Sequence, residues 1–379
     1  MILCALLLHS VHLGRSFFSQ GITIYEDAYG VPSISAANDA EAIYALGYVE
    51  AKDQAVRMAT NYKMARGRLG EVNGKGALLQ DGFLRSVGFE KRSIDLASHL
   101  TGETKVILDA FTSGANKALA EQKDDLPRWI EPFSAVDILS LSQFVNAAFP
   151  LLDLASHLNP GTGSNQFAVA PTRTATHHPI LSIDPHLGWD GQDGGIVWQE
   201  FAIYTPDIHF RGVTIPGLPT GVIGHNDKVA WSMTNNNPQL YTIYTVKLNP
   251  QNRSQYSYHG QWKEFKTEKQ ELRFLDKGEL KSNVNTVRST EWGPMVPFSS
   301  RSVRLAVADP LATLRQSVLM MKAQSATQFR EAFKLRGISM WNFVYAVQRC
   351  LVFAVIPQQG FFRHAARASC YRNQQQHYI

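Results

Sequence analysis

Ser164 stands directly after a glycine and directly before a stretch of alternating polarity, within GTGSNQFAVAP at 161–171. Glycine has no side chain to obstruct its carbonyl group, so the serine hydroxyl can attack the carbonyl carbon of Gly163. Hydrolysis of the resulting ester would free a serine whose α-amine lies beside its own hydroxyl. An α-amine has a pKa of about 8 and can accept the hydroxyl proton near neutral pH. One residue would then supply both nucleophile and base.

Three ordinary motifs are alternatives for this serine, and none fits. A nucleophile elbow requires Gly-x-Ser-x-Gly, but Gln166 replaces the second glycine. A P-loop requires a lysine after its second glycine, where Ser164 and Asn165 stand instead. A phosphate cradle requires a following helix, whereas 165–172 alternates like a strand. On spacing alone, a plain turn that leads into a strand is favoured.

The elements that would position Ser164 change character at Pro160. Apolar residues at helical spacing predict helices before it: from Asn38 or Asp39 to about 69, over 90–127, and from Ser134 onward. Short β-rich segments between turn residues predict strands over 22–36, 164–246 and 253–308. A short helix capped by Ser325 follows.

The composition is that of a globular protein. The chain has 379 residues, 44% of them hydrophobic and 18% charged, which suffices for one large domain or two medium ones. The net charge of +5 comes without a basic run or a basic-aromatic stripe, so we expect no nucleic-acid partner. The three cysteines lie near the ends and lack metal-ligand spacing, which excludes a disulfide framework as the basis of the core.

The two ends of the chain are atypical. MILCALLLHSVHLG suits either the apolar centre of a signal peptide or a buried N-terminal element, and it is too short to span a bilayer. No other apolar stretch approaches the length needed to span a bilayer, so we predict no membrane span. The compartment stays open, with a periplasmic or secreted protein favoured. Residues 347–379 show no clear period and carry no acidic residue, which favours a poorly ordered or non-native end over a nucleic-acid-binding tail.

Several long motifs, in the right order, resemble the penicillin acylase family of N-terminal nucleophile hydrolases. The resemblance covers roughly 22–346. The segments that carry it are IYEDAYGVPSISAANDAEAIYALGYVEAKDQAVRM, MARGRLGEVNG, GSNQFAVAPTRTATHHPILSIDPHLGW, GLPTGVIGHNDKVAWSMTNN and SMWNFVYA.

This resemblance implies an α+β fold with four layers, αββα, in which two stacked antiparallel sheets lie between helices. It divides the chain into a possible signal-like segment (1–21), an α-chain-like region (22–163), a partial β-chain-like nucleophile region (164–346) and an atypical tail (347–379). The family continues well beyond Ala346, so we expect this fold to be incomplete at the C-terminus, as in a truncated or frame-altered product. Two chains of one precursor are expected after cleavage.

The resemblance also assigns roles to individual residues. Ser164 matches the nucleophile, and Gly163–Ser164 matches the bond that cleaves itself. His186 matches a position beside the serine α-amine, with a plain turn histidine as the alternative. The backbone N–H of Asn235 and the side chain of Asn342 match the two donors of the oxyanion hole.

Four aromatic residues are candidates for the acyl pocket, although each could be an ordinary core residue: Phe149, Phe167, Trp189 and Trp231. The activity implied is hydrolysis of the amide bond of an N-acylated small molecule, such as a penicillin or an acyl-homoserine lactone. The alternatives are a catalytically inactive, truncated member of the family and a β-sandwich-type binding module.

No cofactor and no metal are expected. Family members often hold a structural calcium ion, but Gln239 and Thr242 stand here where carboxylates would be expected. Calcium prefers carboxylate oxygens, which makes the site doubtful in this chain.

Overall fold

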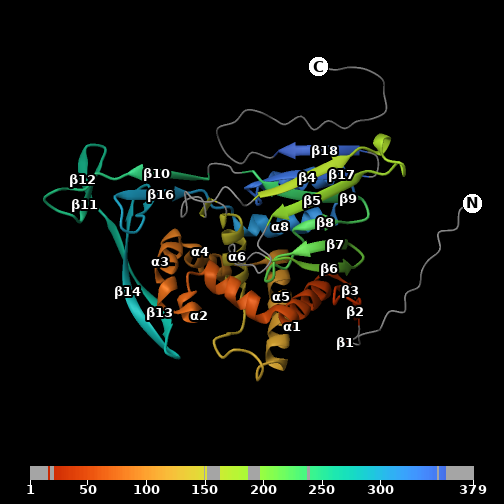
Figure 1. The fold of residues 1–379 in the computed structure, drawn as a ribbon, viewed down its shortest axis with the longest axis horizontal. Helices are drawn as coiled ribbons and strands as arrows, with labels where there is room; N and C mark the ends of the chain where they lie inside the picture. Colours follow the sequence, from red (N-terminus) through yellow and green to blue (C-terminus); the bar gives the residue numbers. More distant parts are fainter. Residues whose placement is uncertain are drawn as a thin grey trace, which may run out of the picture.

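The computed structural model describes residues 16–17, 21–148, 150–151, 163–186, 197–236, 240–347 and 350–355. In this part of the chain, helices dominate before residue 151 and strands dominate after 163, as the sequence predicts. Figure 1 shows the helices below the main sheet and a long β-arm to one side. The predicted helix at 90–127 is in fact two helices followed by turns from 122.

The helices begin where their capping residues allow. The Asn38 side chain accepts a hydrogen bond from the Glu41 N–H at 3.0 Å, and the Ser325 hydroxyl accepts one from Gln328 at 3.2 Å. Before Ser164 lie α1 (Asp39–Ala65), α2 (Gly70–Asn73), η1 (Gly74–Ala77), α3 (Leu78–Val87), α4 (Phe89–Ser98), α5 (Gly102–Glu121) and α6 (Ala135–Val145). After it lie η2 (Pro171–Arg173), α8 (Pro310–Lys322), α9 (Ala326–Ala332) and η3 (Phe333–Leu335). The sequence did not predict α3 or α8.

Nine strands form the main sheet, in the order β1-β2-β3-β6-β7-β8-β9-β17-β18. All neighbours are antiparallel except β3 and β6. The strands are β1 (Ser16–Phe17), β2 (Ile22–Glu26), β3 (Pro32–Ala36), β6 (Gln199–Tyr204), β7 (His209–Thr214), β8 (Ile223–His225), β9 (Val229–Asn235), β17 (Trp341–Val347) and β18 (Cys350–Val355).

A second, two-stranded sheet carries Ser164. Its strands β4 (Gly163–Val169) and β5 (Ile180–His186) form an antiparallel hairpin that lies beside β9 and β17 (Figure 1). Opposite faces of β9 have different neighbours: Trp231 packs on Phe329 of α9, while Ser232 bonds to Gln166 of the hairpin. Helices, main sheet and hairpin are therefore three successive layers. The outer face of the hairpin is open in the described residues, where Phe167 is 58% exposed.

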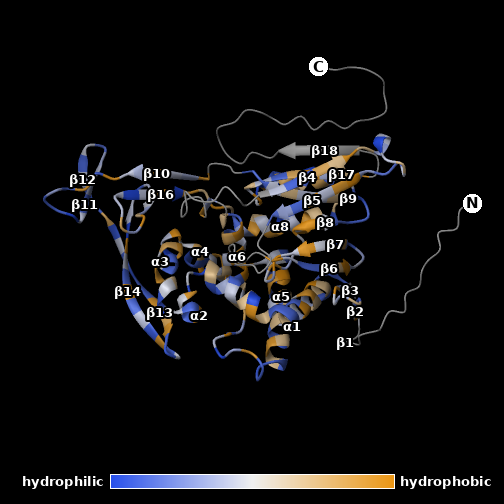
Figure 2. Cartoon of the chain, viewed as in Figure 1, coloured by the Kyte–Doolittle hydropathy of each residue, from blue (hydrophilic) through white to orange (hydrophobic). Residues whose placement is uncertain are grey.

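The remaining strands build the β-arm: β10 (Tyr241–Thr245), β11 (Gln255–Tyr258), β12 (Gln261–Glu264), β13 (Lys266–Asp276), β14 (Glu279–Thr290), β15 (Gly293–Pro294) and β16 (Arg301–Leu305). The long β13–β14 hairpin curves round α2 and α3 (Figure 1). Figure 2 shows mostly hydrophilic residues along β14, which matches its exposure. Arg273 of β13 pairs with the buried Glu71 of α2 at 3.0 Å, and so fixes the arm to the helical layer.

Candidate active site

A small cavity opens where several elements end beside one another. Its walls come from the end of α6, the start of α8, the start of β4, the end of β5, β9, β17 and the segment 215–223. It holds about 60 Å³ of space that water could occupy. The lining is mainly apolar: Val145, Pro185, Trp198, Ile215, Leu218, Val222, Ile223, Met233, Leu314, Ile338 and Trp341, together with Ser142, Asn146, Ser164, Thr220, Thr313 and Ser317.

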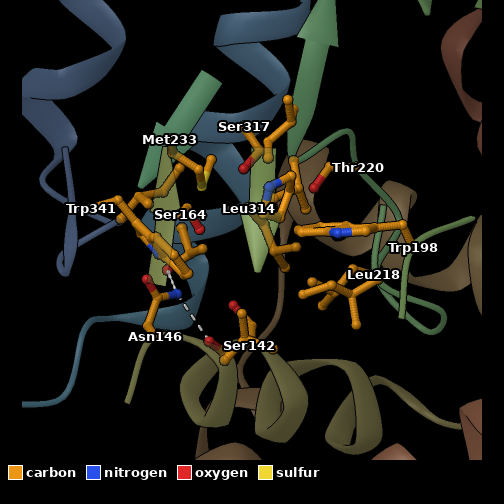
Figure 3. A pocket seen from close by; sticks show the side chains of 17 residues that line it. Ser142, Asn146, Ser164, Trp198, Leu218, Thr220, Met233, Leu314, Ser317 and Trp341 are labelled. Carbon is orange, nitrogen blue, oxygen red and sulfur yellow. Dashed lines mark hydrogen bonds between the residues drawn. The ribbon is translucent and has the colours of Figure 1, made fainter. Parts of the chain in front are cut away.

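Ser164 lies in the wall of this cavity. Figure 3 shows it among Met233, Asn146 and Trp341. In the hairpin register Ser164 is opposite Pro185, which also lines the cavity, so this face of the hairpin points toward the space. The predicted nucleophile is therefore beside an apolar cavity.

His186 lies close to the Ser164 backbone but on the other face of the hairpin. The register places His186 opposite Gly163, the residue before the serine. Side chains alternate along a strand, and the exposed Asn165, Asp184 and His186 share the outer face. The His186 Nε2 atom lies 3.1 Å from the Asn165 Nδ2 atom and 3.2 Å from the Asp184 Oδ2 atom. The His186 side chain thus lies on the face of the hairpin opposite to the Ser164 side chain.

Gln166 fastens the nucleophile strand to the main sheet. Its side-chain N–H groups donate to the Thr234 hydroxyl at 3.1 Å and to the Asn342 carbonyl at 3.2 Å. Its side-chain oxygen accepts from the Ser232 hydroxyl at 2.8 Å. Three hydrogen bonds thus fix the position of β4 two residues after Ser164. Sequence reasoning missed this role because it depends on strands far apart in the chain.

The two predicted oxyanion donors lie side by side on neighbouring strands. Asn342 is opposite Thr234 in the β9–β17 register, and Asn235 is opposite Trp341. The Asn342 side-chain N–H groups donate to the Thr234 hydroxyl and to the Asn235 carbonyl, both at 3.4 Å. Bonds this long are near the limit for N–H···O and are weak. The asparagine amide can exchange them for a stronger acceptor at little cost.

Three buried side chains of α1 hold the turn that forms one wall of the cavity. The carboxyl oxygen of Glu50 accepts from the Gly217 N–H at 2.8 Å. Tyr62 donates to the Gly217 carbonyl at 2.9 Å, and Asn61 donates to the Pro216 carbonyl at 3.0 Å. Burial raises the pKa of Glu50 well above its ordinary value, despite the opposing effect of the Gly217 N–H. Burial thus favours the neutral form of the carboxyl group that supports the cavity wall.

Two of the four predicted pocket aromatics, Phe167 and Trp231, are described by the structure, and neither lines this cavity. Trp231 is buried on the helix side of β9, where it packs between Phe210 and Phe329 and donates to the Val222 carbonyl at 3.0 Å. Phe167 lies on the exposed outer face of the hairpin. Phe149 and Trp189 are outside the described residues.

Trp198 and Trp341 line the cavity instead. Trp341 directly precedes Asn342, so its position was available in the motif SMWNFVYA. Trp198 had no comparable signal.

No metal site emerges from the part of the chain that the structure describes: no three His, Cys, Asp or Glu side chains gather there to hold an ion. Gln239 lies outside that part, so the calcium site stays untested. Among the helices that could be searched, none is long and apolar enough to cross a bilayer.

A family model described as Penicillin amidase matches residues 21–356. The chain belongs to the penicillin amidase family. It has the α+β fold of the N-terminal nucleophile hydrolases, as its motifs predicted, and the described residues supply helices, main sheet and hairpin as three of the expected layers.

Curated relatives of this penicillin amidase family member are acylases. The acyl-homoserine lactone acylase PvdQ of Pseudomonas syringae pv. syringae (strain B728a) is 26% identical over 84% of this chain and 48% of its own length. The acyl-homoserine lactone acylase QuiP of Pseudomonas fluorescens (strain Pf-5) is 25% identical over 64% of this chain and 37% of its own. The chain thus spans less than half the length of these relatives.

Among solved structures, a thermostable penicillin G acylase from Alcaligenes faecalis is similar to this family member with a TM-score of 0.45 and 20% identity. The match covers 52% of this chain and 35% of that one.

Proposed function

We propose that this protein hydrolyses the amide bond of an N-acylated small molecule, with Ser164 as nucleophile after self-cleavage at Gly163–Ser164. One observation carries the proposal: Ser164 is the second residue of β4 and lies in the wall of a mainly apolar cavity. A serine so placed can meet the carbonyl of an acyl group whose chain enters the cavity. Membership of the penicillin amidase family supports the reaction type.

The first step generates the nucleophile. The Ser164 hydroxyl oxygen bonds to the Gly163 carbonyl carbon, the C–N bond between the two residues breaks, and the hydroxyl proton passes to the serine nitrogen. Water then hydrolyses the ester, which leaves a carboxyl group on Gly163 and a free amine and hydroxyl on Ser164. His186 lies opposite Gly163 and is suited to orient the new amine.

Turnover uses the same groups. The Ser164 hydroxyl attacks the acyl carbonyl carbon, and the α-amine accepts its proton and passes it to the leaving nitrogen. An ester of Ser164 forms, and water hydrolyses it to release the acid. The Asn342 amide and the Asn235 N–H would stabilise the oxyanion in both halves, because such donors act on charge that develops in the transition state.

The lining of the cavity indicates the acyl side of the substrate. Apolar side chains such as Leu218, Leu314 and Trp341 favour an aliphatic or aromatic acyl group. Penicillins and acyl-homoserine lactones are the candidate classes, and the relatives named as acyl-homoserine lactone acylases favour the second.

Intact mass and N-terminal sequencing of the purified chain test the proposal. We expect a fragment that begins at Ser164, and no such fragment from Ser164→Ala. Ser182→Ala is the matched control, because Ser182 lies opposite Phe167 on the outer face of the same hairpin and should leave cleavage unchanged. A wild-type chain that stays uncut would overturn the proposal and favour a catalytically inactive family member.

Substrate class is tested by giving the cleaved protein an N-acyl-homoserine lactone and a penicillin as substrates. Release of acid from an N-acyl-homoserine lactone, lost in Ser164→Ala, supports the proposal. Cleaved protein that hydrolyses neither an acyl-homoserine lactone nor a penicillin would contradict it.

A further inference from the structure

One hydroxyl group in the cavity wall has no hydrogen-bond partner in the described structure. Ser142 of α6 is 1% exposed, and its Oγ atom is one of the few buried side-chain oxygens without a partner there. Buried hydroxyls are normally bonded, because leaving one unpaired costs free energy. Figure 3 shows the Ser142 hydroxyl directed from the helix into the cavity.

The position of Ser142 on its helix explains why it faces the cavity. Ser142, Val145 and Asn146 are three and four residues apart, so they share one face of α6, and all three line the cavity. Ser140 is also buried with an unpaired hydroxyl, but it stands on another side of the helix and is not part of the cavity wall. Of the two serines, only Ser142 belongs to the cavity wall.

The other polar groups near Ser142 are already engaged. The Asn146 side chain donates to the Ser142 carbonyl at 3.0 Å and accepts from the Ser339 N–H at 3.3 Å. The Thr313 hydroxyl donates to the Gly337 carbonyl and accepts from the Asn146 side chain at 3.4 Å. None of these groups forms a hydrogen bond with the Ser142 hydroxyl in the described structure.

We propose that Ser142 selects acyl groups that carry an oxygen substituent, a hydroxyl or keto group, on an otherwise apolar chain. The inference rests on the proposed function, because it takes the cavity beside Ser164 as the acyl site. The substituent satisfies the Ser142 hydroxyl while the rest of the chain contacts Leu218, Leu314 and the tryptophans. An unsubstituted chain leaves the same hydroxyl buried and unpaired. The free-energy cost of that unpaired hydroxyl discriminates against unsubstituted chains more strongly than the gain from one formed hydrogen bond favours substituted ones.

Binding of free acids tests this without requiring catalysis. Isothermal titration calorimetry on full-length Ser164→Ala compares octanoic acid with monohydroxy- and monoketo-octanoic acids substituted at each carbon in turn. We expect at least one substituted acid to bind about tenfold more tightly than octanoic acid. When Ser142→Ala is added, the affinities for the substituted acid and octanoic acid should differ by less than about twofold. When Ser140→Ala is added instead, the ratio of the two affinities should stay unchanged.

Three results would overturn the inference: no acid binds, octanoic acid binds as tightly as every substituted acid, or Ser142→Ala weakens all acids equally. Loss of the ratio in Ser140→Ala as well would show a packing effect of α6 and would also overturn it. Because the uncleavable Ser164→Ala chain is used throughout, failure of self-cleavage or hydrolysis affects the proposed function alone.

Discussion

The Gln166 side-chain amide donates a hydrogen bond to the carbonyl oxygen of Asn342 at 3.2 Å, across 176 positions of the sequence. The bond joins β4, which carries the proposed nucleophile Ser164, to β17, which carries a proposed oxyanion donor. Gln166 also bonds to Ser232 and Thr234 on β9. Gln166 thus fixes β4 against β9 and β17, which pair with each other in the main sheet.

Replacement of Gln166 should slow self-cleavage. Gln166→Ala removes three hydrogen bonds, which costs about 2–4 kcal/mol at about 1 kcal/mol each. Gln166→Glu keeps a side-chain oxygen that accepts from Ser232. It replaces the NH₂ group that donates to the Asn342 carbonyl with a second acceptor oxygen. We expect both variants to form the Ser164 fragment at least tenfold more slowly, as measured on denaturing gels. Ser182→Ala is the control, and wild-type cleavage in Gln166→Glu would contradict the expectation.

Asn342→Ala should lower turnover more than substrate binding. Loss of one preorganised oxyanion donor lowers kcat by about 10²–10³-fold. KM should change by less than about threefold, because the donor acts on transition-state charge. The measurement is steady-state hydrolysis of an N-acyl amide by protein whose cleavage has been verified by mass. A raised KM with unchanged kcat would instead assign Asn342 to ground-state binding.

Glu50 should make stability fall as pH rises. Burial raises its pKa well above the ordinary value, so the folded state favours the neutral carboxyl group. That contribution is fully present below the unfolded pKa of 4.5 and is lost as pH rises through the folded pKa. Glu50→Gln keeps a neutral side chain of the same shape at every pH. Urea denaturation should find the variant close to wild type near pH 4 and increasingly more stable toward pH 8.

The control for that experiment is Glu279→Gln, at an exposed position of β14. It should follow the wild-type pH profile. If the stability of Glu50→Gln changed with pH in parallel with that of wild type, the raised pKa of Glu50 would be disproved.

Glu71 should have the opposite pH dependence. Burial acts to raise its pKa, but hydrogen bonds from Arg68 and Lys63 outweigh burial and lower the pKa to about 2. The stabilisation is present above the unfolded value of 4.5 and is lost as pH falls toward 2, which amounts to about 3 kcal/mol. Glu71→Gln should lower the free energy of unfolding by about that amount at pH 7.

Denaturation by urea at pH 7 and pH 3 tests this. Glu268→Gln, which loses an exposed ion pair with Lys91, should change stability by less than about 1 kcal/mol. A Glu71→Gln variant no less stable than Glu268→Gln at pH 7 would refute the role of the buried cluster.

Local signals in the sequence determined much of the secondary structure. Asn38 and Ser325 cap the N-termini of their helices, because a short side chain satisfies free N–H groups of the first turn. The alternating residues after Ser164 predicted a strand, but they did not show which face is covered, because polar Gln166 lies on the covered face and Phe167 on the exposed one. Family motifs supplied the prediction that Gly163–Ser164 is the bond that cleaves itself.

Only the tertiary structure decided which side chains meet at the cavity. Nearly all of β9 and α6 is buried, so neither shows the period that would reveal which face points where. The sequence therefore did not separate Trp231, which lies in the core, from Trp341, which lines the cavity. For the same reason Ser140 and Ser142 looked alike. Their difference arises from packing between elements distant in the chain, and local spacing carries no record of it.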